Sequence, residues 1–273
     1  MALQSALINV IEKAVKKASI KLARDFNEVE HLQVSRKGPA DFVSRADIRT
    51  ERILVEELKE ARPLFGFILE EGEDIPPQDG SNSVWIIDPI DGTTNFLHSI
   101  PHFAISIALE QGGEITAAVI YNPITDEFFW AEKGRGAFIG NRRLTVSSRK
   151  NLNECVLATG IPFHARPHQE TFITNLEHLM GEVAGVRRFG SAALDLAYVA
   201  AGRYDGFWEE GLSSWDIAAG ILIVREARGM VSEFDGRGKM LQTGQILATN
   251  GSIHGTVTRL LSSARKAHKQ KQK

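Results

Sequence analysis

Apolar residues recur at helical spacing near the start of the chain. From residue 2 to about residue 27 they fall every three or four positions, and this period predicts an amphipathic helix. A second helix is predicted from residue 44 to residue 61. Ser44 is a suitable N-cap for it, and Pro63 follows its end.

The pattern then changes to short apolar runs with β-branched residues. These runs are separated by turn-forming residues, of which the longest stretch, EDIPPQDGSNS, spans residues 73 to 83. Such runs predict strands, the last three of which form a meander. The predicted strands are residues 65–69, 84–88, 104–110, 114–121 and 127–131.

A polar stretch, SSRKNLN, lies near residue 150 and marks a change in organisation. We take it as the junction between an N-terminal lobe, residues 1–145, and a C-terminal lobe, residues 146–262. In the second lobe, helical patterns dominate, with short strands between them. The predicted helices are residues 168–180, 191–202 and 215–227, and we expect residues 263–273 to form a basic, flexible tail.

Composition excludes several classes of protein. The 273 residues carry a formal net charge of −2, so the overall basic field typical of nucleic-acid binding is absent. The longest apolar run, residues 217–224, is far shorter than the roughly 20 residues that cross a bilayer. There is a single cysteine, Cys155, which suits a reducing compartment. We therefore expect a cytoplasmic protein without a membrane anchor.

The stretch WIIDPIDGTTNF, residues 85 to 96, carries the first chemical hypothesis. Asp88 ends an apolar run that does not alternate, as in a strand buried on both faces. A carboxylate there is costly unless a cation meets it, and no Lys or Arg lies between residues 82 and 101. Mg²⁺ is a suitable partner for a few carboxylates. The backbone N–H groups that follow Gly92 suit an anion such as phosphate.

These residues carry a family resemblance. WIIDPIDGTTNF resembles the first signature of the inositol monophosphatase family of Mg²⁺-dependent, lithium-sensitive phosphatases, and SWDIAAG, residues 214 to 220, resembles the second. The run GSAALDLAYVAAGRYDGF from residue 190 is most similar to the bacterial extragenic-suppressor branch. The resemblance implies a homodimer and an α/β (α+β) fold, a layered α-β-α-β-α sandwich of two lobes with the metal site between them.

The resemblance also implies the residues of the site. About two to three Mg²⁺ ions per subunit would be bound, and their ligands would be Glu70, Asp88, the carbonyl oxygen of Ile90, Asp91 and Asp216. Glu70 and Thr93 would orient the attacking water, with Asp47 hydrogen-bonded to the Thr93 hydroxyl. The substrate would contact Asp91, Gly92, Thr93, Ala192 and Glu209.

One residue beside these ligands departs from the family pattern. Leu69 stands before Glu70, where a small or hydroxyl residue is usual. It could change the occupancy of a third metal site and the sensitivity to lithium.

The resemblance implies hydrolysis of a small phosphate monoester, foremost myo-inositol 1-phosphate, by in-line attack of metal-activated water. Sibling activities on fructose bisphosphate, 3′-phosphoadenosine phosphate, histidinol phosphate or NADP are alternatives. The carboxylate of Glu209 favours a neutral polyol over a second phosphate. A role as a binding partner of RNA or transcription machinery is the alternative from another class.

Overall fold

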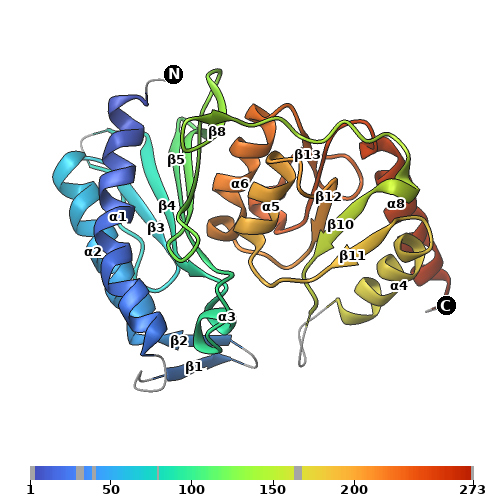
Figure 1. Cartoon of the computed structure of the whole chain (residues 1–273), viewed down its shortest axis with the longest axis horizontal. Helices are drawn as coiled ribbons and strands as arrows, with labels where there is room; N and C mark the ends of the chain where they lie inside the picture. Colours follow the sequence, from blue (N-terminus) through green and yellow to red (C-terminus); the bar gives the residue numbers. More distant parts are fainter. Residues whose placement is uncertain (1–3, 29–33, 39–40, 79, 163–167, 272–273) are drawn as a thin grey trace.

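The computed structural model describes residues 4–28, 34–38, 41–78, 80–162 and 168–271. Five layers alternate between helices and sheets (Figure 1). The predicted α-β-α-β-α sandwich is therefore confirmed. Within the described residues no helix combines the length and apolarity needed to span a membrane.

The first two layers are a helix pair and a seven-stranded sheet. Helices α1 (Ala6–Asn27) and α2 (Arg45–Ala61) pack on each other and on one face of the sheet. Ser5 and Ser44 cap them, each accepting a hydrogen bond from a first-turn N–H. In sheet order the strands are β3 (Gly66–Leu69), β4 (Ser83–Asp91), β5 (Ala104–Gln111), β6 (Glu114–Asn122), β7 (Glu127–Glu132), β8 (Gly136–Ile139) and β9 (Arg142–Arg143).

The sheet is buried on both faces at β4, as its uninterrupted apolar sequence predicted. Trp85 and Ile87 pack toward α1 and α2, whereas Ile86 belongs to the cluster on the other face. That second cluster is formed with α5 (Ala192–Ala200) and α6 (Ser214–Glu226), the middle layer. Because α6 packs against the first sheet and also against strands of the second sheet, its apolar residues surround the whole helix.

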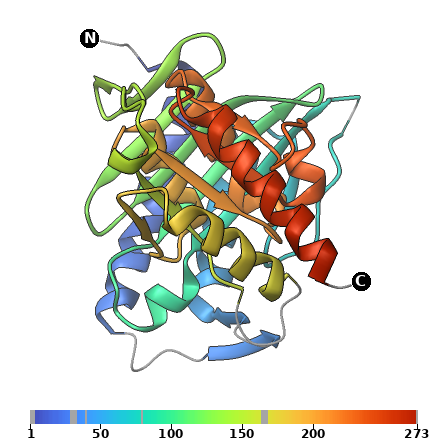
Figure 2. The same cartoon turned by 90° about the vertical axis from the view of Figure 1, so that its right-hand side faces the viewer.

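The remaining layers belong to the C-terminal half. The second sheet has the order β11 (Gly185–Arg187), β10 (Val156–Thr159), β12 (Gly206–Glu209), β14 (Ile246–Thr249) and β13 (Met230–Ser232). Helices α4 (Gln169–Met180) and α8 (His254–Lys271) lie side by side on its outer face (Figure 2). Residues from 263 onward, which we expected to form a tail, are helical as far as Lys271, and Ala264 is buried.

Short elements complete the described chain. The strands β1 (Val34–Gly38) and β2 (Asp41–Ser44) pair with each other, and α3 (Thr93–Leu97) follows β4. A 3₁₀ turn (Leu152–Glu154) precedes β10, and α7 (Met240–Thr243) precedes β14. The first sheet ends before the expected junction near residue 145, and β10 starts the second sheet. The helices α5 and α6 nevertheless pack on both sheets, so the two lobes share their middle layer.

Candidate active site

The end of β4 brings two aspartates to one place. In a regular strand, residues three apart face opposite sides. The pairing of β4 with β5 shifts register between Asp88 and Asp91, which lets both carboxylates face the same space. The N–H of Ile90 donates to Asp88 Oδ1 at 2.9 Å and fixes this side chain.

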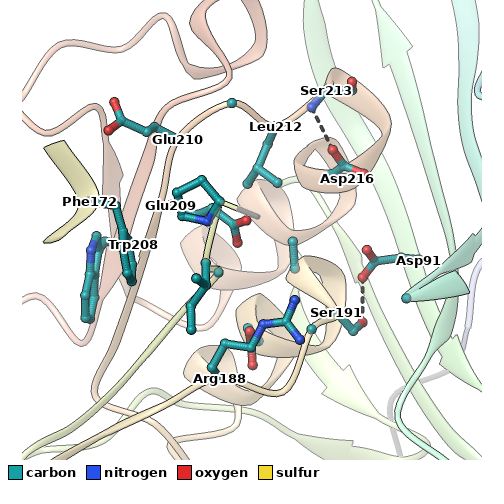
Figure 3. Close-up of a pocket in the computed structure, with 18 of the residues that line it drawn as sticks. Asp91, Phe172, Arg188, Ser191, Trp208, Glu209, Glu210, Leu212, Ser213 and Asp216 are labelled. Atoms are coloured by element: carbon teal, nitrogen blue, oxygen red, sulfur yellow. Dashed lines mark hydrogen bonds between the residues drawn. The ribbon is translucent and has the colours of Figure 1, made fainter. Parts of the chain in front are cut away.

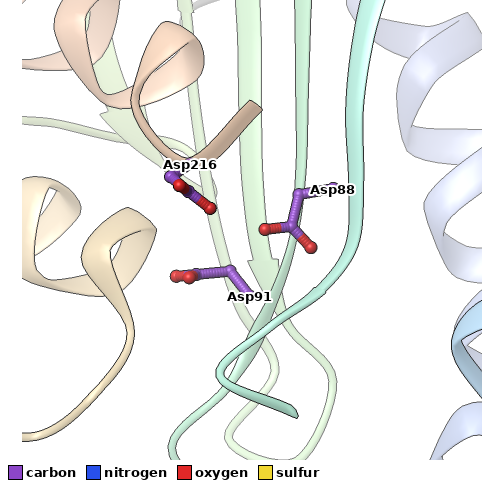
Figure 4. A group of neighbouring side chains, drawn as sticks. All are labelled: Asp88, Asp91 and Asp216. Carbon is purple, nitrogen blue, oxygen red and sulfur yellow. The ribbon is translucent and has the colours of Figure 1, made fainter. Parts of the chain in front are cut away.

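A third aspartate comes from the other half of the chain. Asp216 lies in the first turn of α6, where its Oδ2 accepts the N–H of Ser213 at 2.6 Å. Carboxylate oxygens of Asp88, Asp91 and Asp216 all lie within 4.8 Å of one another (Figure 4). Asp88 and Asp91 are only 1% and 8% exposed. Three close carboxylates, two of them buried and that of Asp216 half-buried, have the ligand chemistry that Mg²⁺ requires.

Burial and neighbouring carboxylates raise the pKa values within this cluster. Burial raises the pKa of Asp88 well above its ordinary value, and the carboxylates of Glu70, Asp91 and Asp216 raise it further. Burial likewise raises the pKa of Asp91 to about 6, against the lowering effect of its hydrogen bonds. Either a proton or a cation relieves the repulsion between carboxylates held this close, and the donor set fits a divalent metal.

Glu70 approaches the cluster from the neighbouring strand. Strands β3 and β4 are parallel, and Leu69 pairs with Ile87, so Glu70 and Asp88 follow at adjacent strand ends. Glu70 is not one of the three close carboxylates. It lines a cavity that Asp91 and Asp216 also line.

The turn after Asp91 depends on glycine. Gly92 has φ = 100°, a left-handed conformation. A Cβ atom there would lie 3.1 Å from the carbonyl oxygen of Gly190 and 3.2 Å from that of His102. The chain then enters α3, whose first N–H groups have no partner inside the helix, and Gly92, Thr93 and Thr94 line the cavity.

The Thr93 hydroxyl is held between two acceptors. It lies 3.2 Å from Asp47 Oδ1 and 3.1 Å from the carbonyl oxygen of Ile90. Asp47 is fully buried and also accepts from the N–H and hydroxyl of Ser44, at 2.8 and 2.6 Å. The contact between Asp47 and Thr93 that we expected is therefore present.

The N-terminus of α5 lines the cavity on the side of Asp91. Ser191 caps this helix, and its hydroxyl donates to Asp91 Oδ2 at 2.5 Å (Figure 3). The N–H of Ala193 donates to the same oxygen at 2.7 Å. We did not predict Ser191, although a serine directly before the helical run AALDLAYVA is a capping pattern.

The cavity measures about 740 Å³ and extends well past the carboxylate cluster. Glu209, at the end of β12, separates the cluster from an aromatic wall that includes Phe172 and Trp208 (Figure 3). The Glu209 carboxylate lies directly against Gly160, where a Cβ atom would come within 1.8 Å of Oε1.

The structure collects the residues predicted for the site. Around the cavity lie Glu70, Asp91, Gly92, Thr93, Ala192, Glu209 and Asp216. Asp88, Ile90 and Asp47 stand behind them and contact this set. Arg188 and Asp195 also line the cavity, and neither was predicted as a site residue. Their roles, like those of the predicted residues, are proposals below.

The chain is similar to known proteins over nearly its whole length. The model of the Inositol monophosphatase family matches residues 3–269. An inositol-1-monophosphatase of Rhizobium meliloti is 58% identical over 250 residues, which is 92% of this chain and 94% of that protein. The Nus factor SuhB of Pseudomonas aeruginosa is 43% identical and covers 89% of this chain and 91% of its own. The crystal structure of extragenic suppressor protein suhB from Bartonella henselae is 54% identical with a TM-score of 0.91, over 94% of this chain and 98% of that one.

Proposed function

The chain belongs to the inositol monophosphatase family of phosphatases, and on that premise we propose that it hydrolyses small phosphate monoesters, foremost myo-inositol 1-phosphate, with Mg²⁺. The observation that carries the proposal is that Asp88, Asp91 and Asp216 lie close together beside the N-terminus of α3. Oxygen ligands for a cation and N–H groups for an anion lie side by side there, as a metal-bridged phosphate requires.

The chain's own residues divide the work as follows. Glu70, Asp88, the carbonyl of Ile90, Asp91 and Asp216 would hold about two to three Mg²⁺ ions. When bound, Mg²⁺ supplies positive charge to the phosphate and lowers the pKa of water. The site thereby gains the charge and alignment on which phosphoryl transfer depends.

Thr93 would orient the attacking water. Its hydroxyl hydrogen points to Asp47 or to the carbonyl of Ile90, so a lone pair of its oxygen would accept a hydrogen bond from that water. Glu70, which lines the cavity, would accept the second hydrogen bond from the water. The N–H groups of Gly92 and Thr93 would hold the phosphate in line with this water.

The alcohol part of the substrate would lie between α5 and β12. Asp91, Ala192 and Glu209 line that part of the cavity. The Glu209 carboxylate suits hydroxyl donors and repels a second phosphate, so we favour a neutral polyol over the sibling bisphosphate substrates.

The test is phosphate release from a panel of monoesters and bisphosphates as Mg²⁺ is titrated from zero. We expect strong preference for myo-inositol 1-phosphate, no turnover in excess chelator, and loss of turnover in Asp91→Asn. Lithium inhibition is measured in the same assay. Turnover that persists in excess chelator would refute the metal requirement.

A second function is favoured by one observation. Relatives 43% identical to this chain are named Nus factor SuhB, so we also propose an interaction with transcription machinery. The Asp91→Asn protein separates the two roles. If it restores growth or transcription phenotypes in a deletion strain, binding rather than catalysis accounts for the cellular task; if it fails while remaining folded, catalysis does.

We further propose that the protein is a homodimer. Light scattering coupled to size exclusion gives the mass directly, and a mass of about 30.1 kDa, that of one chain, would refute it.

A further inference from the structure

One carboxyl group in the cavity wall is buried without a hydrogen-bond partner at one oxygen. Asp195 lies in the first turn of α5, is 1% exposed, and lines the cavity. Its Oδ1 accepts no hydrogen bond from the part of the chain that the structure describes. A buried polar atom left in this state costs free energy, and in a cavity wall a bound ligand, or the water that it displaces, can satisfy it.

Two other aspartates, equally buried, show what a structural carboxylate looks like in this protein. Asp47 accepts from the N–H and hydroxyl of Ser44. Asp205 accepts from Val156 N–H at 2.8 Å and from Arg149 at 3.2 Å, and from a nearby serine hydroxyl. Both side chains are satisfied by the fold itself. Asp195 differs from them in facing a cavity.

The surroundings of Asp195 define the chemistry of its ligand. Burial raises the pKa of Asp195 most, the carboxylates of Glu209 and Asp91 raise it further, and the guanidinium of Arg188 lowers it, so all three groups are its electrostatic neighbours. In Figure 3 the Glu209 and Arg188 side chains both point into the space beside Asp91. Three acidic groups against one cation make a poor site for a second phosphate and a good one for hydroxyl groups.

From this placement we infer that Asp195 binds a hydroxyl group of the polyol substrate, together with Glu209, and so helps to set substrate specificity. The inference rests on the proposed function and names a residue that the family resemblance did not. Ala192 and Asp195 are three positions apart on one helix and therefore lie on the same side of it. A polyol ring placed over Ala192 would reach the Asp195 carboxyl.

A purely structural role is the competing explanation. An acidic side chain in the first turn of a helix interacts favourably with the helix dipole, and Asp195 occupies such a position. That role predicts an effect on stability and none on the choice of substrate, which separates the two explanations.

The experiment compares Asp195→Leu and Asp195→Asn with wild type. Leucine is close in shape and removes both oxygens, whereas asparagine keeps an acceptor. Values of kcat and KM are measured with Mg²⁺ for myo-inositol 1-phosphate and for p-nitrophenyl phosphate, which has no hydroxyl groups. Leu196→Val serves as the control, since Leu196 lies against Gly220 in the core and its shortening affects packing alone.

We expect Asp195→Leu to lower kcat/KM for myo-inositol 1-phosphate about 10- to 100-fold, chiefly through KM, while p-nitrophenyl phosphate stays within about threefold. Asp195→Asn should stay within about threefold of wild type for both esters. An equal fall for both substrates, or no fall for either, would overturn the inference and leave the proposed function standing.

Failure of the proposed function has a different signature. If wild type hydrolyses neither ester, calorimetric titration of myo-inositol 1-phosphate into wild type and Asp195→Leu in Mg²⁺ decides the matter. Weaker binding by the variant would support the inference. Equal affinity, or no binding by wild type, would overturn it.

Discussion

Removing one charge from the carboxylate cluster should stabilise the metal-free protein while abolishing its activity. Asp88 is 1% exposed and surrounded by the carboxylates of Glu70, Asp91 and Asp216. Asp88→Asn keeps the oxygen that accepts the N–H of Ile90, and its new amide hydrogens face the neighbouring carboxylates. The substitution therefore removes repulsion without leaving a buried group unpaired.

The size of the effect follows from proton linkage. Because the pKa of Asp88 is raised far above 3.8 in the folded protein, folding at higher pH requires either taking up a proton or burying a charge. At pH 7 this cost cannot exceed about 4 kcal/mol, the free energy of protonating a carboxyl of pKa 3.8. Allowing for burial of the amide, we expect Asp88→Asn to be more stable by on the order of 2 kcal/mol.

The pH dependence has a definite sign. A raised folded-state pKa costs nothing below the unfolded value, near pH 4, and costs more as the pH rises. The advantage of Asp88→Asn should therefore grow by up to about 1.4 kcal/mol per pH unit between pH 4 and pH 7, and be small at pH 4.

The assay is urea unfolding in EDTA at pH 5, 6 and 7, followed by circular dichroism. Asp205→Asn is the matched control, because Asp205 is equally buried but accepts hydrogen bonds from Arg149 and Val156. Its loss should destabilise the protein by about 1–3 kcal/mol. Added Mg²⁺ should stabilise wild type and have little effect on Asp88→Asn. If Asp88→Asn is less stable than wild type in EDTA at pH 7, the argument fails.

Three further substitutions test separate parts of the account. Gly160→Ala places a Cβ atom against the flexible end of Glu209, so we expect unchanged thermal unfolding and a KM for myo-inositol 1-phosphate raised about 10-fold; an unchanged KM would contradict this. Gly220→Ala places its Cβ 2.3 Å from Leu196 Cδ1 and 2.5 Å from Leu196 Cβ, so urea unfolding should show a loss of about 1–3 kcal/mol. Thr93→Val keeps the shape of the side chain and removes the hydroxyl, and we expect kcat in steady-state assays to fall about 10²-fold or more; a normal kcat would exclude Thr93 from orienting water.

Much of the fold could be predicted from local patterns. The helix at residues 44–61 and the strands of the meander were predicted within a few residues, because caps, turns and apolar periods act locally. The continuous apolar run before Asp88 correctly indicated a strand buried on both faces. The helical structure of residues 263–271 was harder to predict. These residues continue helix α8, which packs against α4 and β14.

The candidate site was only partly accessible to sequence reasoning. Asp88 and Asp91 are close together in the chain, and the apolar strand before Asp88, with no Lys or Arg nearby, suggested a metal. Asp216 lies far along the chain, in helix α6 of the middle layer, and only the family resemblance connected it to them. Asp195 looked like any residue of an apolar helix, because its unpaired oxygen appears only when α5 is placed beside β12.

The central claim is that Asp88, Asp91 and Asp216 together hold the metal on which hydrolysis depends. Mn²⁺ prefers the same oxygen ligands as Mg²⁺ and can be located by its anomalous scattering in crystals soaked with it. We predict anomalous density within bonding distance, about 2.0–2.2 Å, of carboxylate oxygens from all three aspartates, together with turnover supported by the same ion. Crystals of an active protein with no density at these carboxylates, or with density elsewhere, would contradict the account.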